Sequence, residues 1–387
     1  MISILYTLLL FFSFWGLGVS IIRYVPGKHK TILEKHLFSI GIGYALFTNV
    51  LFFLGLISLV NQYSILFIFI ISLIISLIAL RHEQPLSKVK INALKNIKTS
   101  TIAIISILFV LTIMNLIGAL APPSLADSLR HHLAAPKYYA EVGGFPFVPI
   151  NPWPMPGLLH VLFTKVLILS NGVSCQIIIY IFGLLTTISV YGITCKYFGS
   201  TAGLLASLIY YSLPLTTELS TGAMPEHAAI FLSLMSVWAI MNGLENKINY
   251  RTRWLILAGL LGGCAGATKV WALLGGPACV VIIIYLCYTN SINFKTTITC
   301  LILYSLAYGV ILAPWFLRNF IASGNPLWPF GYYIFDTKYW SEIGVLKYSN
   351  WSRGPKSSLA NYLIGPWSLT NQIGKYSAGQ GPINHYL

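Results

Sequence analysis

The chain alternates between long apolar blocks and shorter polar segments. A helix that crosses a bilayer needs about 20 consecutive apolar residues. Ten blocks reach or approach that length, so the pattern predicts an all-α, polytopic membrane protein with about ten transmembrane helices. The predicted spans are Ile2–Ile22, Leu37–Val60, Tyr63–Leu80, Thr101–Ala121, Gly172–Cys195, Thr201–Thr217, Ala228–Leu244, Trp254–Thr268, Val270–Tyr288 and Thr297–Leu317.

Two apolar segments need a separate interpretation. The first block lacks a basic stretch before it, so it is predicted to be a transmembrane helix and not a signal peptide. Leu158–Leu169 is too short to span and is interrupted by His160 and Lys165, which predicts an interfacial helix. The chain then divides into an N-terminal four-helix region (1–121), a loop with juxtamembrane helices (122–171), a six-helix core (172–317) and a C-terminal segment (318–387).

Composition supports the membrane assignment and changes the meaning of the net charge. Of the 387 residues 56% are hydrophobic and 9% are charged, against roughly 25% charged in a soluble domain. The formal net charge of +15 therefore does not indicate a nucleic-acid-binding surface, because the basic residues are scattered between apolar blocks. The six cysteines show no metal-ligand spacing such as C-x-x-C, and we expect them to be inert.

The basic residues also predict an orientation. Loops on the cytoplasmic side of a membrane protein carry the excess of Lys and Arg. One set of alternate loops holds 14 of the 24 basic residues, in segments that are mostly short. That set is predicted to be cytoplasmic, so the N-terminus, the 122–171 loop and the 318–387 segment are predicted to lie outside. The expected location is the plasma membrane, with a bacterial inner membrane favoured and the active site on the periplasmic face.

The 122–171 loop opens with residues that can carry chemistry. If 124–135 forms a short helix, Asp127, Arg130 and His131 share one face at positions i, i+3 and i+4. Asp127 then lies in the first turn, where the helix dipole favours an ionised carboxylate that can accept a proton. The alternative is a helix-capping aspartate beside two solvated histidines, His131 and His132.

Three further charged residues lie at the same predicted face. Lys269 follows a glycine-rich stretch at the junction of two spans, where an ionisable residue is costly and usually functional. Arg318 ends the tenth span, and Glu226 begins the seventh. The alternatives are a snorkelling lysine, an interfacial anchor and a helix cap. A carboxylate base with two cations and polar histidines suits transfer from a lipid phosphate, since the cations stabilise charge on the leaving phosphate.

The order of these residues resembles that of a known superfamily. The run Asp127-x-Leu129-x-His131-His132-Leu133-x-x-Pro136-Lys137-x-Tyr139 is similar to the first outer loop of integral-membrane GT-C glycosyltransferases, among them protein O-mannosyltransferases and aminoarabinose transferase-like enzymes. Glu226, Thr268-Lys269 and the run from Pro314 to Asn319 follow in the same order, and the resemblance covers about residues 122–335. The chain differs in having His131 where Tyr is common, Glu226 where Asp is common, and three additional N-terminal spans.

The resemblance implies transfer of a hexose or pentose from a polyprenyl-phosphate carrier to a lipid-, glycan- or protein-linked acceptor. It implies Asp127 as general base, and Lys269 and Arg318 as contacts to the carrier phosphate, with His131, His132 and Glu226 as further substrate-binding residues. A divalent metal is compatible with these side chains, but no ligand spacing demands one. Relatives continue beyond the position of Leu387, so the chain is a short variant, a fragment, or a protein that acts with a protein partner.

Two other functions remain as alternatives. A non-catalytic transporter or subunit for lipid-linked glycans would place its charges near the bilayer midplane within broken helices. An envelope polysaccharide polymerase or ligase shares the lipid-linked donor and differs mainly in donor size. The predicted gathering of charges at one interface favours an enzyme over a transporter.

Overall fold

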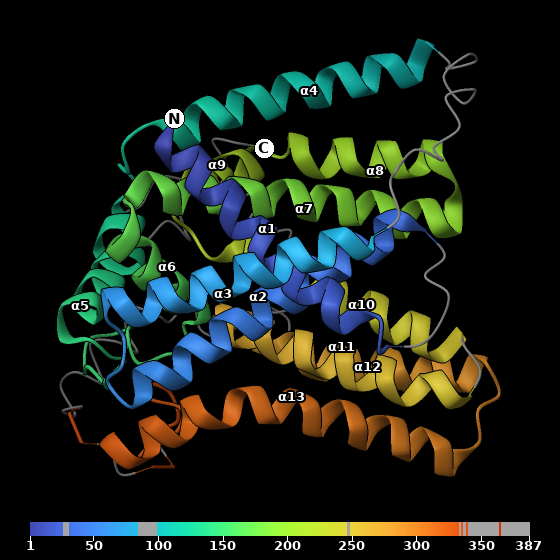
Figure 1. Ribbon diagram of the computed structural model, residues 1–387. Coiled ribbons are helices and arrows are strands. Elements are labelled where there is room, and N and C mark those ends of the chain that lie inside the picture. The colour runs from blue at the N-terminus through green and yellow to red at the C-terminus, as the bar shows by residue number, and fades with distance from the viewer. Residues whose placement is uncertain are drawn as a thin grey trace.

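The computed structural model describes residues 1–25, 31–83, 99–245 and 248–332, together with 334–335, 338–339 and 364. Helices make up nearly all of the regular structure in these ranges, and most run roughly parallel or antiparallel in one bundle (Figure 1). Eight segments are long and apolar enough to cross a membrane. The prediction of an all-α polytopic membrane protein is confirmed. Most of the predicted C-terminal segment 318–387 lies outside the described residues.

The N-terminal region consists of α1 (Ile2–Ile22), α2 (Ile32–Leu56), α3 (Gln62–His82) and α4 (Thr99–Leu120). Helix α1 contacts both α2 and α3, whereas α4 lies at the edge of the bundle against α7, α8 and α9 (Figure 1). Only Asn115 and Ala119 of α4 are buried. The apolar surface that α4 leaves exposed is what a helix facing lipid presents.

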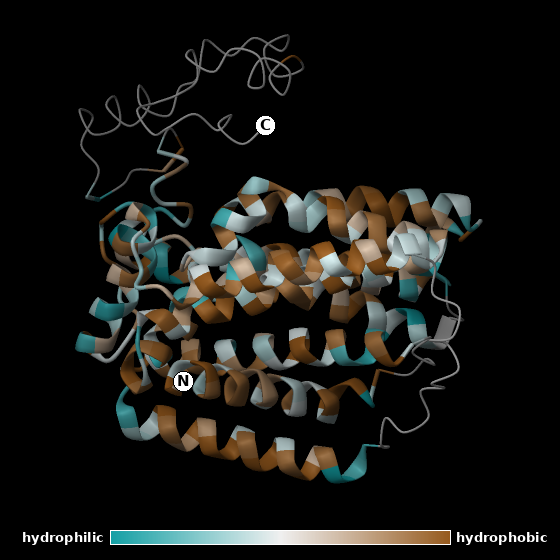
Figure 2. Ribbon diagram, turned by 90° about the horizontal axis from the view of Figure 1, so that it is seen from above, coloured by the Kyte–Doolittle hydropathy of each residue, from teal (hydrophilic) through white to brown (hydrophobic). Residues whose placement is uncertain are grey.

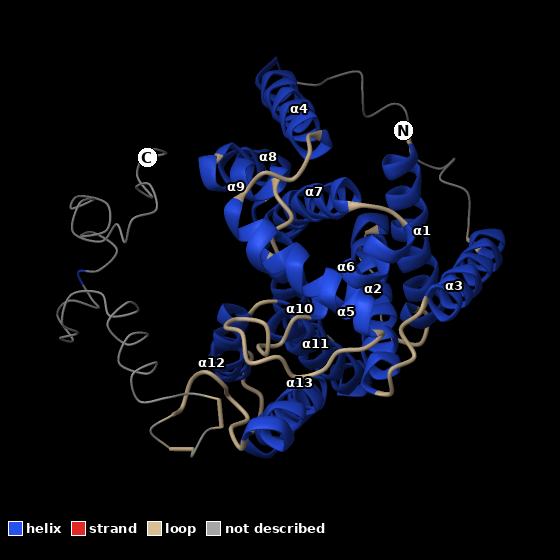
Figure 3. Ribbon diagram, turned by 90° about the vertical axis from the view of Figure 1, so that its left-hand side faces the viewer, coloured by secondary structure: helices blue, strands red, loops and turns tan. Residues whose placement is uncertain are grey.

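The loop after α4 folds into η3, a π-helix (Ser128–Leu133), and α5 (Ala134–Val142), and α6 (Leu158–Leu169) follows. The predicted helix 124–135 therefore has a different geometry. The boundaries of α6 match the prediction, but the expected interfacial location was wrong. Eight of its side chains are buried, because α6 packs among α2, α3, α5, α7 and α11 (Figure 3).

Burial of α6 encloses a charged residue. Lys165 is 1% exposed, and its ammonium donates a hydrogen bond to the Tyr6 hydroxyl at 3.1 Å. The ammonium also lies 3.7 Å from the ring centroid of Phe69 and 5.1 Å from that of Phe47. Aromatic faces attract a desolvated cation by about 2 kcal/mol or more. The three rings belong to α1, α2 and α3, so this contact joins α6 to the N-terminal helices.

The second half of the bundle differs from the prediction at two spans. It consists of α7 (Gly172–Phe198), α8 (Ser200–Ser212), α9 (Pro214–Thr221), α10 (Glu226–Glu245), α11 (Ile248–Thr268), η4, a 3-10 helix (Val270–Leu274), α12 (Gly275–Thr289) and α13 (Phe294–Ser323). The predicted span Thr201–Thr217 is divided before Pro214, which begins a new helix, so α8 is too short to cross. Helix α11 is long enough, but its polar first turns and glycines make it less apolar than the eight candidate spans.

The glycines of α11 let this helix pack closely against α13. A Cβ atom added at Gly259 would lie 2.4 Å from the carbonyl oxygen of Tyr304, and one at Gly263 would lie 2.7 Å from that of Tyr308. Both carbonyls belong to α13, so only glycine permits this approach of the two helices. The packing fixes α11 within the core and thereby fixes the position of its last residues.

Both ends of the bundle are polar, and one of them carries the additional helices α5 and α6 with their loops. Hydrophobic residues dominate the length of the helices and hydrophilic residues gather at their ends (Figure 2). The end view shows α5, α6 and the loops between them over the ends of α10, α11 and α13 (Figure 3). The described residues Asp127, Glu226, Lys269 and Arg318 all lie at this end, as the alternation of spans predicts.

Candidate active site

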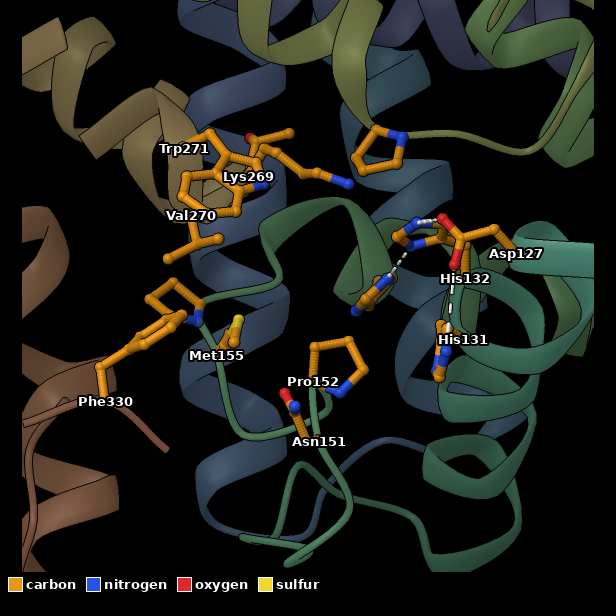
Figure 4. Close-up of a pocket in the computed structure, with 14 residues that line it drawn as sticks. Asp127, His131, His132, Asn151, Pro152, Met155, Lys269, Val270, Trp271 and Phe330 are labelled. Carbon is orange, nitrogen blue, oxygen red and sulfur yellow. Dashed lines mark hydrogen bonds and ion pairs between the residues drawn. The ribbon is translucent and has the colours of Figure 1, made fainter. Parts of the chain in front are cut away.

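A pocket of about 330 Å³ opens at the end of the bundle that carries α5 and α6. Most of its lining comes from Asp127 and the η3 turn, His160 of α6, the loop 151–156, and the junction of α11 with η4, and Pro225 and Phe330 complete it. Figure 4 shows Asp127 on one side of the pocket and Lys269 on another, with the Lys269 side chain extending into the space between them. The pocket therefore has an acidic wall, formed around Asp127, and a basic wall, formed around Lys269.

The π-helix sets which residues accompany Asp127. One carboxylate oxygen lies 3.3 Å from Nε2 of His132 and the other lies 3.9 Å from Nε2 of His131. The hydrogen bonds of a π-helix join residues i and i+5 and its turn is wider than that of an α-helix, so position i+5 joins position i+4 beside Asp127. The prediction that Arg130 shares this face was wrong, because it assumed α-helical spacing. Arg130 is exposed and does not line the pocket.

Asp127 is ionised and accessible. Its side chain is 50% exposed, whereas that of His132 is 6% exposed. The interaction with the His132 imidazole, together with the positive charge of Lys269, outweighs burial and lowers the pKa of Asp127 to about 2. Burial lowers the pKa of His131, which favours its neutral form beside the carboxylate. A half-exposed carboxylate facing a pocket can accept a proton from a bound hydroxyl group.

His160 is a site residue that the sequence analysis did not identify. Its Nε2 lies 2.8 Å from Nδ1 of His132, and His160 also lines the pocket. Burial lowers the pKa of His160 well below its usual value. The available signal was a single polar side chain in an otherwise apolar block, and this was interpreted only as an interruption of the helix.

The basic wall is formed where α11 ends. Lys269 adopts an extended conformation between α11 and η4, and its ammonium lies 2.8 Å from Oε1 of Glu226, the first residue of α10. The two side chains are 21% and 25% exposed. Oε2 of Glu226 is buried and has no hydrogen-bond partner among the described residues. The sequence analysis predicted Glu226 and Lys269 at the same face of the membrane, and in the structure their side chains are in contact.

Arg318 lies at the same end but does not line the pocket. Its Nη2 donates a hydrogen bond of 2.6 Å to the carbonyl oxygen of Pro154, and the neighbouring Asn319 donates one of 2.9 Å to the same oxygen. The guanidinium also lies over the ring of Trp315, 5.1 Å from its centroid. These contacts attach the end of α13 to the loop 151–156. Helix α13 extends six residues past the predicted span, so Arg318 belongs to a helix and not to the C-terminal segment.

The turn after α13 supplies another lining residue that the sequence analysis missed. Gly324 has a φ of +79°, which ends the helix in the left-handed region that glycine adopts without strain. The buried Asn325 accepts a hydrogen bond from the backbone N–H of Leu327 and donates one to the carbonyl oxygen of Phe330. This turn brings Phe330 to the pocket. The Gly324-Asn325-Pro326 run indicates a turn, but the run alone does not indicate which side chain the turn presents.

Metal and thiol chemistry receive no structural support in the described part of the chain. No group of three or more His, Cys, Asp or Glu residues there is arranged to hold a metal ion. All six cysteines are free, and five of them are buried in the bundle.

Comparison with known proteins identifies part of the chain. Residues 149–317 match the family described as dolichyl-phosphate-mannose-protein mannosyltransferase. This segment of the polytopic membrane protein is therefore similar to mannosyltransferase-like GT-C enzymes, which use a sugar donor carried on a lipid phosphate. No curated protein and no solved structure matches the chain significantly.

The matched segment is narrower than the resemblance predicted and covers somewhat less than half of the chain. It contains His160, Glu226 and Lys269, and it ends one residue before Arg318. Asp127, His131 and His132 precede it. The family match thus supports the donor class, while the assignment of a base depends on the geometry of the pocket.

Proposed function

We propose that the protein transfers a sugar from a polyprenyl-phosphate carrier to a cell-envelope acceptor, with Asp127 as the general base. One observation carries the proposal: the half-exposed Asp127 carboxylate and the Lys269 ammonium face the same pocket from opposite walls. The match to lipid-phosphate-dependent glycosyltransferases supports the donor class.

In the proposed reaction an acceptor hydroxyl group gives its proton to a carboxylate oxygen of Asp127. The acceptor oxygen forms a bond to the anomeric carbon of the sugar. The bond between that carbon and the phosphate oxygen breaks, and its electron pair leaves on the carrier phosphate. Attack from the face opposite the phosphate inverts the anomeric configuration, as the resemblance implies.

Lys269 is the proposed contact to the carrier phosphate. An ammonium group has three donors, of which Glu226 Oε1 uses one at 2.8 Å. The other donors are left for phosphate oxygens, where hydrogen bonds strengthen as charge develops. The unpartnered Oε2 of Glu226 is the proposed acceptor for a sugar hydroxyl group.

Arg318 has two proposed tasks. Its bond to Pro154 supports a role in holding the loop that lines the pocket. Its Nη1 is buried and has no partner among the described residues, and it is the proposed contact to a carrier phosphate that reaches the end of α13. His131 and His132 flank the base and are proposed to contact substrate through the pocket that they line.

The size of the pocket supports a single sugar over a long glycan as the transferred unit. About 330 Å³ lies at the lower end of the range of ligand pockets, which is about 300–1,000 Å³. A hexose or a pentose fits this description, and the acceptor is proposed to be lipid-, glycan- or protein-linked. The proposed location is the plasma membrane of a bacterium, with the pocket on the periplasmic face.

The assignment of the base is tested by Asp127→Asn. We expect transfer to fall by about 100- to 10,000-fold, because the amide cannot accept the acceptor proton and general-base catalysis contributes about 10²–10⁴-fold. Glu141→Gln is the matched control, since Glu141 is an exposed acid of the same loop region that does not line the pocket. Full transfer by a well-expressed, membrane-inserted Asp127→Asn protein would reject the assignment.

The reaction class is tested by mass spectrometry of the lipid-linked sugars that accumulate when the gene is deleted. A glycosyltransferase leaves its monosaccharide-linked carrier unused, whereas a polymerase or ligase leaves a longer lipid-linked glycan. A transporter leaves its cargo on the opposite leaflet with its composition unchanged. Complementation by the wild-type chain and by the Glu141→Gln chain, but not by Asp127→Asn, would assign the accumulated donor to this pocket.

A further inference from the structure

Another cavity lies at the end of the bundle opposite the candidate active site. Helix α3 follows Val60, whose N–H donates a hydrogen bond to the carbonyl oxygen of Gly143 at the end of α5, and it runs the length of the bundle to His82 (Figure 1). The cavity has a volume of about 580 Å³ and lies among the last turns of α1 and α3 and the first turn of α2. A helix of 21 residues is about 30 Å long, so the apolar part of the bundle separates this cavity from the candidate active site.

Two contacts on either side of the cavity explain why space remains there. A Cβ atom added at Gly16 would lie 2.3 Å from Cα of Ser76, so α1 and α3 approach closely at this level. At the end of the bundle, Lys35 of α2 bridges to Glu83 at the end of α3, with its ammonium 2.6 Å from both carboxylate oxygens. The cavity lies between the close helix contact and this ion pair.

The lining of the cavity is apolar within the bundle and polar at the end of the bundle. Its inner part is lined by Val19, Ile75, Ile78 and Ala79, and its outer part by Ser20, Arg23, Lys35, His82 and Glu83. A ligand that matches both parts has a long apolar segment joined to a polar or charged group. Membrane phospholipids have this division, and basic pockets between helices at a membrane surface bind their head groups.

Arg23 gives the outer part a cation that no described acid neutralises. Lys35 is occupied by Glu83, whereas Arg23 is exposed and forms no ion pair with a described residue. Its guanidinium lies 5.0 Å from the ring centroid of Tyr24. A guanidinium group has five N–H donors in a planar fork that matches phosphate oxygens. With two cations against one acid, the outer part favours an anionic ligand.

The sequence that adjoins the cavity carries further positive charge. The segments 26–30 and 84–98, which follow α1 and α3, contain lysines but neither Asp nor Glu. These lysines are Lys28, Lys30, Lys88, Lys90, Lys95 and Lys98. Both segments lie outside the described residues and count here by their sequence alone. Basic segments next to membrane helices attract anionic lipids, so the adjoining charge favours an anionic phospholipid over a zwitterionic one.

We propose that this cavity binds an anionic glycerophospholipid, with its phosphate at Arg23 and an acyl chain along the apolar residues of α1 and α3. A soluble phosphate compound would share the contact with Arg23 but would leave the apolar part of the cavity without a partner. A zwitterionic phospholipid would bring an ammonium group toward Arg23 and Lys35. The site is separate from the candidate active site, and the proposal does not rest on the proposed transfer reaction.

The test is native mass spectrometry of the full-length protein in detergent micelles. Phosphatidylglycerol, phosphatidylethanolamine and glycerol 3-phosphate are added to separate samples at equal concentrations. We expect phosphatidylglycerol to bind at least about fivefold more tightly than phosphatidylethanolamine, and glycerol 3-phosphate not to be retained. Arg23→Gln should weaken phosphatidylglycerol binding by about fivefold or more, the contribution of one basic residue beside an anionic lipid.

Arg81→Gln is the matched control, because Arg81 is an exposed arginine of the last turn of α3 that does not line the cavity. It should leave the binding of phosphatidylglycerol near that of the wild type. Ser20→Leu fills the cavity without changing its charge and should also weaken binding. The Ser20 hydroxyl donates a hydrogen bond to the carbonyl oxygen of Gly16 in its own helix, so this substitution removes no bond between helices.

Four results would each overturn the proposal. Equal losses in Arg23→Gln and Arg81→Gln would assign the binding to general surface charge, and unchanged binding in Ser20→Leu would place the lipid outside the cavity. Equal affinity for phosphatidylethanolamine would remove the selectivity for an anionic lipid. Binding of glycerol 3-phosphate as tight as that of phosphatidylglycerol would assign the site to a soluble phosphate compound. No sugar donor is used, so these results are independent of the transfer assay.

Discussion

Two carboxylates lie at this site and have different surroundings: Asp127 lines the acidic wall of the pocket, and Glu226 binds Lys269 of the basic wall. Asp127 lies beside two imidazoles on a π-helix and is 50% exposed, whereas Glu226 is bound to an ammonium group and is 25% exposed. The first carboxylate can be reached by a hydroxyl group, and the second is occupied in holding Lys269. An acidic residue near a pocket is therefore not a candidate base by position alone. Its partner and its exposure distinguish a candidate base from a residue that positions a cation.

The two walls also differ in whether the family match covers their residues. The basic wall lies within the segment that matches the mannosyltransferase-like family, and Asp127 lies before it. Four substitutions, taken after Asp127→Asn, sharpen or break this contrast.

The largest effect is expected from Lys269→Gln. Loss of a charge-assisted hydrogen bond to the leaving phosphate costs about 1.5–3 kcal/mol, which corresponds to a decrease in kcat/KM of about 10- to 150-fold. The measurement is transfer from the lipid-linked donor identified by mass spectrometry. Lys137→Gln is the matched control, since Lys137 is an exposed lysine of α5 outside the pocket lining. Equal losses in the two variants would remove Lys269 from the site.

Glu226→Gln is expected to lower kcat/KM about tenfold, because the amide holds the ammonium less firmly. The informative measurement is the double variant with Lys269→Gln. If Glu226 acts through Lys269, the two losses are not additive, and the double variant resembles Lys269→Gln alone. Additive losses would instead give Glu226 an independent contact with substrate.

Arg318→Lys is expected to lower kcat/KM by about three- to tenfold. A lysine keeps the charge but cannot bind Asn319 and the Pro154 carbonyl with a planar fork of donors. If the role is to hold the loop 151–156, proteolysis of that loop should become faster along with the loss of transfer. A loss of donor affinity with unchanged proteolysis would favour the direct phosphate contact.

The smallest effect is expected from His131→Asn. His131 lies 3.9 Å from Asp127, is 29% exposed and has a lowered pKa, so it is largely neutral near pH 7 and contributes little charge. A decrease in kcat/KM of less than about threefold is consistent with a weak, exposed interaction. A decrease as large as that of Lys269→Gln would show that the acidic wall depends on both histidines.

The sequence predicted the helical class, most of the spans and the gathering of charges at one end, because all three follow from the spacing of apolar blocks. It could not predict the π-helix, since nothing in Ser128–Leu133 distinguishes a repeat of five residues from one of four, and Arg130 was misplaced for that reason. The partner of Arg318 is a backbone carbonyl 164 residues away, which no local pattern encodes. The burial of α6 depends on contacts with helices distant in sequence.

The contact between Lys165 and the rings of α1, α2 and α3 bears on how the protein is assembled. Tyr6, Phe47 and Phe69 are synthesised before Lys165 emerges from the ribosome, so the surroundings of this ammonium are in place when α6 is made. Without them α6 would present an unpaired charge to lipid, at a cost of several kcal/mol. Although the N-terminal helices precede the matched segment, they are needed for α6, and so for His160, to enter the bundle. An expression boundary drawn at the family match would separate a helix from the partners that let it fold.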